Sequence, residues 1–174
     1  NPESFCFGTD AVLLADFATV KKNAVICDLG TGTGILPILL YGRHAFLHCD
    51  AVEIQPDMAD MAARSVRYNG LEEKIQICSG DFRNIRDLLP ACAYSTVVCN
   101  PPYKRHNSGE CNDQDAHTLS RHEETCTLED VCTAAAYLLK NGGRLAMVNH
   151  SDRIVDIFET MRRHRLEPKR CRLV

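Results

Sequence analysis

The strongest constraint on the fold of this chain is a glycine-rich segment, Asp28-Leu-Gly-Thr-Gly-Thr-Gly34. The apolar run Ala24–Asp28 at its start predicts a buried strand. The residues that follow, 35–43, predict a helix with Pro37 in its first turn, where the missing N–H costs little. Glycines let the backbone approach a ligand closely and leave amide groups available at the start of a helix. A strand, a glycine loop and a helix in this order predict a ligand-binding turn, with a bare tight turn as the alternative.

The spacing of these glycines narrows the class of ligand. A dinucleotide site requires Gly-x-Gly-x-x-Gly. Here Gly30, Gly32 and Gly34 follow the pattern Gly-x-Gly-x-Gly, with Asp28 two residues before the first glycine. This spacing argues against NAD as the ligand.

Short apolar runs alternate with helical patterns along the rest of the chain. Helices are predicted at Ala11–Val20, Pro56–Asn69, Phe82–Leu89, 127–140 and Ser151–Arg165, and strands at His48–Ile54, Lys74–Ser79, Tyr94–Cys99, Arg144–Asn149 and Lys169–Val174. Strands separated by helices predict an α/β fold with a doubly wound, mostly parallel sheet. The 174 residues fit a single domain, 1–174. Because the chain begins with Asn1 and ends inside a predicted strand, we expect a fragment whose C-terminal strands are truncated.

Polar residues close several of the predicted strands. In sheets of this kind, ligands bind beyond the carboxyl ends of the strands. Glu53, Asp81 and Asn100 each follow such an end, so we expect them along one edge with the glycine loop. A carboxylate at Glu53 can accept both ribose hydroxyls of an adenosine-containing cofactor. An exposed strand end is the alternative for Glu53.

Asp81 and Phe82 follow the third predicted strand of the sheet. The Asp81 carboxylate can accept a hydrogen bond from the amino group of an adenine, and Phe82 can cover the adenine ring. Capping of the next helix is the alternative for Asp81. The two roles are compatible.

The most specific motif is Asn100-Pro101-Pro102-Tyr103. The nitrogen of a planar amine is a poor nucleophile, because its lone pair is delocalised. Two acceptors that hold the amino hydrogens can free this lone pair, and the Asn100 side-chain oxygen and the Pro101 carbonyl supply such a pair. Pro102 fixes the backbone, and Tyr103 offers a face on which a base can stack, a contact worth about 1–3 kcal/mol. A simple strand-to-loop turn is the alternative.

A long polar segment, 104–122, follows this motif and has no periodicity. Loops of this length inside compact domains are usually functional or disordered. Thr127-Leu-Glu-Asp130 then has the form of a capping box at the start of a helix. Asn141-Gly-Gly143 is expected to end that helix.

The ten cysteines are scattered singly, with no Cys-x-x-Cys pair. Several of them, such as Cys27, Cys78 and Cys99, lie in apolar strand patterns, where a free cysteine behaves as a small hydrophobic residue. We therefore expect buried, reduced cysteines, no metal site, and a cytoplasmic setting. No apolar run approaches the roughly 18 residues that a membrane helix needs.

The charge of the chain is uneven. The net charge is −3, yet six basic residues gather near the end, namely Arg162, Arg163, Arg165, Lys169, Arg170 and Arg172. A basic end on an acidic body can contact a phosphate backbone. A solvated helix end is an equally good interpretation.

Together these motifs resemble the amino-methylating branch of class I S-adenosylmethionine-dependent methyltransferases, which have a Rossmann-like fold. The flanking segments resemble the bacterial tRNA1(Val) (adenine-37)-N6-methyltransferase family more narrowly. These segments are Phe7-Gly-Thr-Asp10, Leu13-Leu-Ala-Asp-Phe17, Arg121-His-Glu123, Leu128-Glu-Asp130 and Leu138-Leu-Lys-Asn-Gly-Gly143. The resemblance covers essentially the whole chain.

The resemblance implies methyl transfer from S-adenosylmethionine to the 6-amino group of an adenine in RNA, with tRNA favoured. The implied cofactor-binding residues are Asp28, Gly30, Thr31, Gly32, Thr33, Gly34, Glu53, Asp81 and Phe82. The implied catalytic residues are Asn100, Pro101, Pro102 and Tyr103. The alternatives are a DNA adenine, a protein glutamine amide, or a non-catalytic module that binds RNA or protein.

Overall fold

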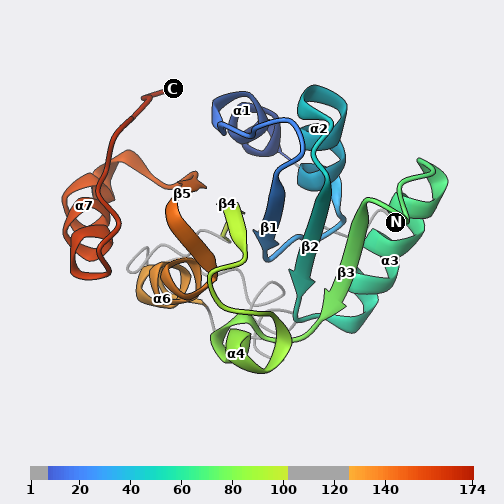
Figure 1. The fold of residues 1–174 in the computed structure, drawn as a ribbon. Helices are drawn as coiled ribbons and strands as arrows, with labels where there is room; N and C mark the ends of the chain where they lie inside the picture. The colour runs from blue at the N-terminus through green and yellow to red at the C-terminus, as the bar shows by residue number, and fades with distance from the viewer. Residues whose placement is uncertain (1–7, 102–125) are drawn as a thin grey trace, which may run out of the picture.

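The computed structural model describes residues 8–101 and 126–174. Within these ranges, five strands form one sheet in the order β3-β2-β1-β4-β5 (Figure 1). The strands are β1 (Val25–Leu29), β2 (His48–Glu53), β3 (Ile75–Ser79), β4 (Tyr94–Cys99) and β5 (Leu139–Met147). All four pairings between neighbouring strands are parallel. The predicted doubly wound, mostly parallel α/β sheet is confirmed.

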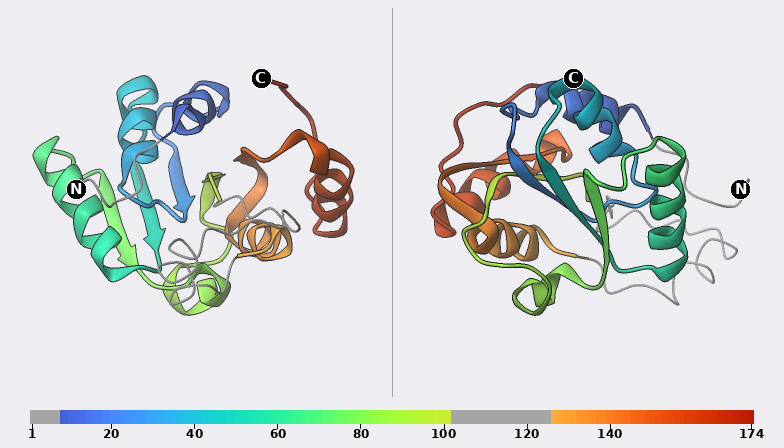
Figure 2. Two further views of the ribbon diagram at one scale, coloured as in Figure 1. Left: turned by 180° about the vertical axis from the view of Figure 1, so that it is seen from behind. Right: turned by 45° about the vertical axis from the view of Figure 1, so that its right-hand side comes forward.

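Helices cover both faces of the sheet (Figure 2). They are α1 (Thr9–Phe17), α2 (Ile35–His44), α3 (Pro56–Tyr68), α4 (Ile85–Leu88), α6 (Leu128–Leu138) and α7 (Ile154–Arg163), with 3-10 turns η1 (Phe82–Asn84) and η2 (Ser151–Arg153). Apolar residues of α1, α2 and α3 form one core layer with the sheet. Residues of α4 and α6 form a second layer on the other face. Two buried layers follow from strands that are apolar on both faces.

The order of the strands determines where a ligand can bind. The chain passes from β1 to β2 and β3 on one side, and then returns to place β4 on the other side of β1. In open α/β sheets, ligands bind at such a switch point, beyond the carboxyl ends of the strands. The segment after β1 is the glycine loop, and the residue after β4 is Asn100. These two features therefore flank the expected crevice.

Several predicted boundaries are wrong by a few residues. Helix α1 ends at Phe17 rather than Val20, and the predicted helix Ser151–Arg165 divides into η2 and α7. The capping box of Thr127 and Asp130 is present at the start of α6, as predicted. Asn141-Gly-Gly143 does not end this helix. The helix ends at Leu138, and the glycine segment lies inside β5, where the register with β4 shifts.

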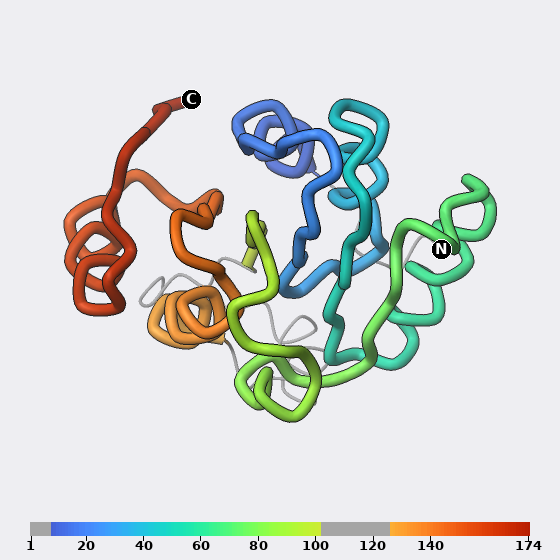
Figure 3. Tube along the Cα trace, in the orientation of Figure 1, coloured from blue at the N-terminus to red at the C-terminus, as the bar shows by residue number. Residues whose placement is uncertain are grey.

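The prediction of a strand at Lys169–Val174 is wrong. These residues have no regular secondary structure, and the segment runs from α7 back towards α1 (Figure 3). Arg170 donates hydrogen bonds to the Thr19 hydroxyl and the Phe17 carbonyl, and Arg172 pairs with Asp16. Side-chain contacts with α1, rather than sheet pairing, fix its position.

Candidate active site

The glycine loop has a backbone that other residues rarely adopt. Gly30, Gly32 and Gly34 have φ angles of 73°, 58° and 79°, in the left-handed region that favours glycine. A Cβ atom on Gly34 would also lie 3.2 Å from the Cβ of Ala62 on α3. The loop is held by the carbonyl of Val52, which accepts hydrogen bonds from the Gly30 and Thr31 amides at 2.9 and 3.0 Å. The left-handed backbone favours glycine at all three positions, and the close contact with α3 adds a second requirement at Gly34.

Glu53 lies beneath this loop at the end of β2. Its carboxylate accepts hydrogen bonds from the Gly32 amide at 2.7 Å and from the Gln55 amide at 2.9 Å. The residue is only 5% exposed, so the alternative of an exposed strand end is wrong. Glu53 therefore supports the loop directly. Its predicted role as a ribose acceptor stays a prediction.

A cleft opens between the carboxyl ends of β1 and β4. It is lined by Ala11, Asp28, Gly30, Thr31, Gly32, Thr33, Ile35, Leu36 and Asn100, and holds about 420 Å³ including its open mouth. The structure thus brings six of the predicted site residues together around one cleft. Glu53 touches this cleft through Gly32, whereas Asp81 and Phe82 lie outside its lining.

Asp28 is the most unusual group of the cleft, because it is a carboxylate buried to 1% exposure. Both of its oxygens, and the hydroxyl of Thr31, lack a hydrogen-bond partner among the described residues. Burial is the main cause that raises the pKa of Asp28, the nearby Thr31 hydroxyl opposes the rise, and the charge of Glu53 adds to it, so that the pKa lies at about 7. Buried polar groups without partners are costly. The site is therefore suited to a ligand that brings a positive charge or N–H donors.

Asp81 is held by Arg83, a residue that no sequence motif indicates. The Arg83 amide donates to Asp81 Oδ1 at 2.9 Å, and the Arg83 guanidinium donates to Oδ2 at 2.8 Å. The alternative that Asp81 caps the following turn is confirmed. Arg83 also lowers the pKa of Asp81 below its usual range. The amide of Gly80 donates a hydrogen bond to the Glu53 carbonyl, and this bond keeps the ends of β2 and β3 together.

Phe82 is buried in the core layer of α4 and α6, at 9% exposure. Ile54, directly after Glu53, is instead 51% exposed. An exposed apolar side chain beside a buried carboxylate is a second candidate for covering an adenine ring. The sequence offered one signal for it, an apolar residue just beyond the end of a strand.

Asn100 is half-buried at the end of β4, where it lines the cleft. The carbonyl of Cys99 accepts a hydrogen bond from the Val148 amide, which joins this strand end to the residue after β5. Pro101 is the last described residue of the motif. Pro102, Tyr103, the segment 104–122 and Arg121-His-Glu123 lie outside the described residues, so the expected base contact of Tyr103 stays a prediction.

The predicted basic end is divided by the structure into separate contacts. Arg162 pairs with Glu167, and Arg163 pairs with Glu129 on α6. Arg170 and Arg172 instead contact α1. These four arginines therefore make contacts in different places, which does not favour a single basic cluster at the end of the chain.

The eight cysteines in the described ranges are all free. Cys27 and Cys99 are buried as expected, whereas Cys78 is only half-buried. Cys92 and Cys171 are exposed, so the expectation of burial is wrong for these two. Across the described ranges there is no cluster of three metal-ligating side chains, and none of the helices is long and apolar enough to span a membrane.

Comparison with known proteins gives one family. Residues 7–164 match the methyltransferase small domain. A Porphyromonas gingivalis (strain W83) protein named tRNA1(Val) (adenine(37)-N6)-methyltransferase is 32% identical over 156 residues, covering 86% of this chain and 60% of the relative. A protein of the same name from Tolumonas auensis is 33% identical over 142 residues, covering 81% and 57%. The chain thus spans about 60% of the length of the curated relatives that it matches.

Solved structures of lower identity share the fold. A predicted O-methyltransferase from Agrobacterium tumefaciens superposes with a TM-score of 0.67 at 21% identity, covering 87% of this chain and 66% of that chain. TrmN from Thermus thermophilus gives 0.61 at 18% identity, covering 91% and 40%. The Rossmann-like methyltransferase fold is confirmed.

Proposed function

This chain belongs to the methyltransferase small domain family. From this premise, we propose that its domain, residues 1–174, transfers a methyl group from S-adenosylmethionine to the 6-amino group of an adenine in RNA, with tRNA favoured. The observation that carries the proposal is the buried, partnerless carboxylate of Asp28 in the same cleft as Asn100.

The residues of the cleft fit the proposed cofactor. S-adenosylmethionine carries an ammonium group and a sulfonium, and a buried carboxylate without donors is stabilised by such a positive charge. The Asp28 carboxylate and the Thr31 hydroxyl would accept from the ammonium group. The glycine loop lets the backbone approach the ligand, and Glu53, fixed beneath the loop, has acceptor capacity left for the ribose. Asp81, with Phe82 or Ile54, would hold the adenine.

The proposed chemistry depends on holding the target amine. S-adenosylmethionine supplies an activated methyl group, so no strong base is needed before transfer. The side-chain oxygen of Asn100 and the carbonyl of Pro101 would accept the two amino hydrogens and make the nitrogen lone pair available in line with the methyl group. Pro102 would fix this backbone and Tyr103 would stack on the base. Catalysis then rests on orientation and fixed dipoles.

The proposed substrate is only one of the substrates that the Asn-Pro-Pro-Tyr motif allows. Asn-Pro-Pro-Tyr chemistry serves any planar amine, so a DNA adenine and a protein glutamine amide remain candidates. The names of the relatives favour tRNA. We place the reaction in the cytoplasm, because free cysteines are typical of a reducing compartment.

The test is incubation of the chain with methyl-labelled cofactor and, separately, total tRNA, DNA or protein. Label in 6-methyladenine of tRNA is the expected result. Label in DNA or in glutamine would replace the proposed substrate. Cofactor binding with no transfer to any of them would favour a non-catalytic module. Asn100→Ala serves as the matched control, because it removes the proposed acceptor and leaves Asp28 and the loop intact.

A further inference from the structure

Five basic residues lie on segments near the amino ends of β1 and β2 or contact those segments, at the end of the sheet opposite the cleft. Lys21 and Lys22 lie in the turn between α1 and β1, Arg43 is near the end of α2, and Arg170 and Arg172 come from the C-terminal segment. We call these five residues the basic patch. They come from three segments of the sequence that only the fold brings together.

Contacts with residues at the end of α1 hold three of the five. Asp16 pairs with Arg43 at 3.2 Å and with Arg172 at 2.8 Å. The guanidinium of Arg170 stacks on the ring of Phe17, 4.5 Å from its centroid, and donates to the Phe17 carbonyl at 3.0 Å. Arg172, and then Arg43, lower the pKa of Asp16. Each of the three guanidiniums therefore has at least one partner at the end of α1.

The patch carries far more positive than negative charge. Asp16 is the one carboxylate that pairs with these five cations in the part of the chain that the structure describes. The chain as a whole has a net charge of −3, so this surface opposes the general trend. Lys21, Lys22 and Arg170 are exposed, and the side chains of Arg43 and Arg172 are 47% and 46% exposed. Like charges on one surface repel, which an anionic partner would relieve.

A purely structural role accounts for only part of this arrangement. Arg170 and Arg172 attach the C-terminal segment to α1, and cations are favourable at the ends of α1 and α2. Lys21 and Lys22 are not needed for either purpose. A guanidinium has five N–H donors, and hydrogen bonds among the described residues use one on Arg43, one on Arg172 and two on Arg170. Donors thus remain for the oxygens of a phosphate.

We propose that the basic patch binds the phosphate backbone of the RNA whose adenine enters the cleft. The inference rests on the proposed function and adds a second, distant contact to it. The patch lies at the amino ends of the strands, whereas the cleft lies at their carboxyl ends. Five residues of β1 separate the two, or about 17 Å at about 3.3 Å per residue. An RNA that extends only one or two nucleotides beyond the target adenine is too short to reach the patch. A folded tRNA arm is long enough to reach it.

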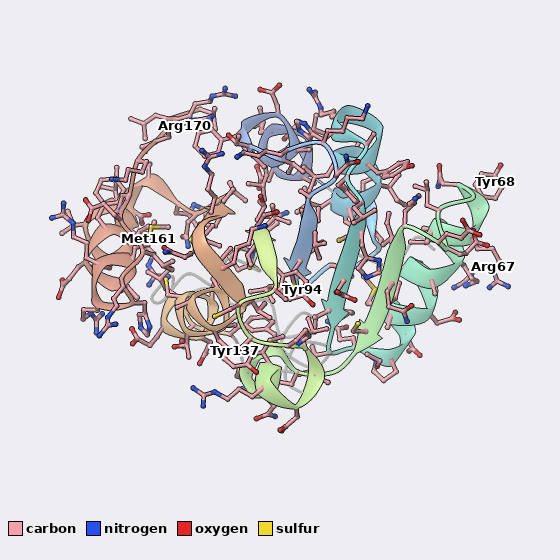
Figure 4. All side chains as sticks on the ribbon, viewed as in Figure 1. Arg67, Tyr68, Tyr94, Tyr137, Met161 and Arg170 are labelled. Atoms are coloured by element: carbon pink, nitrogen blue, oxygen red, sulfur yellow. The ribbon has the colours of Figure 1, made fainter. Side chains whose placement is uncertain are left out.

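This distance provides the test. Lys21→Glu/Lys22→Glu reverses two charges of the patch and leaves the arginine contacts with α1 intact. Arg64→Glu/Arg67→Glu on α3 makes the same change of net charge on a surface away from the patch (Figure 4, where Arg67 and Arg170 are labelled). For each protein, affinity is measured for total tRNA over a range of salt, and for a trinucleotide with a central adenine. Thermal melting checks that the variants are folded.

The patch variant is expected to lose about tenfold or more in tRNA affinity, with a salt slope shallower by about one to two. Its affinity for the trinucleotide should stay unchanged, and the α3 variant should keep most of its tRNA affinity. Wild-type tRNA affinity and salt slope in the patch variant would overturn the proposal. So would an equal loss in both variants, or a parallel loss for the trinucleotide. Failure of the proposed function gives a different result, namely no methylation of RNA by the wild type, because the binding comparison does not depend on transfer.

Discussion

Glu53 accepts a hydrogen bond from the backbone amide of Gly32 at 2.7 Å, which joins the buried end of β2 to the middle of the glycine loop. The same carboxylate accepts a hydrogen bond from the Gln55 amide, at the start of the segment that leads into α3. One side chain thus fixes two backbone segments at the edge of the cleft. A residue predicted for binding is therefore also a structural support, and the two roles need separate measurements.

Glu53→Ala should weaken both the loop and the proposed ribose contact. Removing it leaves two backbone amides without their acceptor, at a cost of about 1–3 kcal/mol of unfolding free energy. Cofactor affinity should fall in addition. Chemical denaturation without ligand reports the first effect, and titration calorimetry of the folded fraction reports the second. A destabilised variant that binds S-adenosylmethionine as well as wild type would leave Glu53 with its structural role alone.

Asp28 makes stability depend on pH in an uncommon direction. In the unfolded chain its carboxyl loses its proton near the ordinary pKa of about 4, whereas in the fold burial holds the pKa at about 7. Between these values the folded state binds one more proton than the unfolded state. Stability of the ligand-free protein should therefore fall as pH rises from about 4 to about 7, by up to about 1.4 kcal/mol per pH unit. Asp28→Asn should remove this slope in urea unfolding.

The same group should control cofactor affinity in the opposite sense. A ligand ammonium is stabilised by the ionised carboxylate, so below pH 7 binding must expel a proton from Asp28. Affinity for S-adenosylmethionine should rise by up to about tenfold per pH unit towards pH 7 and level off above it. Asp28→Asn should bind more weakly and without this slope. The range from about pH 5 to about pH 8 includes the pKa of Asp28. If the wild-type affinity for S-adenosylmethionine is constant over this range, Asp28 is not the counter-ion of the ligand ammonium.

Arg83 should determine how well the protein recognises the adenine ring of its cofactor. Its guanidinium and amide occupy about three of the four acceptor positions of Asp81, and they leave one for an amino group. Arg83→Ala should free the Asp81 carboxylate to move and raise its pKa towards the ordinary value. Wild type should bind S-adenosylhomocysteine better than the inosine analogue, which lacks the amino group. This preference should shrink several-fold in Arg83→Ala and recover in part in Arg83→Lys. An unchanged ratio would mean that Asp81 acts as a cap alone.

The central part of the fold was predictable from the sequence because its signals are local. The strand and glycine loop of 24–34 and the strand of 94–99 are set by apolar runs and by backbone angles that few residues tolerate. Parallel topology then brings Asp28 and Asn100 to one cleft without further information. The strands and the loop depend on residues close together in the sequence, and the meeting of Asp28 and Asn100 follows from the general topology of such sheets.

The wrong predictions concern contacts between distant segments. Alternating residues in Lys169–Val174 have the pattern of a strand, but the arginines find better partners in Asp16 and Phe17. Asn141 and Gly142 have the composition of a helix end, yet the register shift between β4 and β5 accommodates them within a strand. Arg83 was overlooked because an exposed arginine in a turn has no distinctive sequence pattern. Only the fold shows which acid it meets.

Asn100 should separate catalysis from cofactor binding. It lines the cleft at the end of β4, and its side-chain oxygen is proposed to accept a hydrogen from the target amine. Asn100→Ala removes this acceptor but leaves Asp28, Glu53 and the glycine loop in place, so S-adenosylmethionine affinity should stay within about twofold of wild type. Methyl transfer should fall by about two to three orders of magnitude, as when a fixed hydrogen-bonding group is removed from an active site.

The conservative variant Asn100→Asp makes the prediction sharper, because a carboxylate oxygen can accept the same hydrogen. Single-turnover transfer to tRNA should follow the order wild type, Asn100→Asp, Asn100→Ala, while calorimetry gives similar cofactor affinities for all three. A general structural defect would lower cofactor affinity together with the rate, and both substitutions would then behave alike. If folded Asn100→Ala transfers the methyl group at the wild-type rate, the amine is held by other groups and the proposed mechanism is wrong.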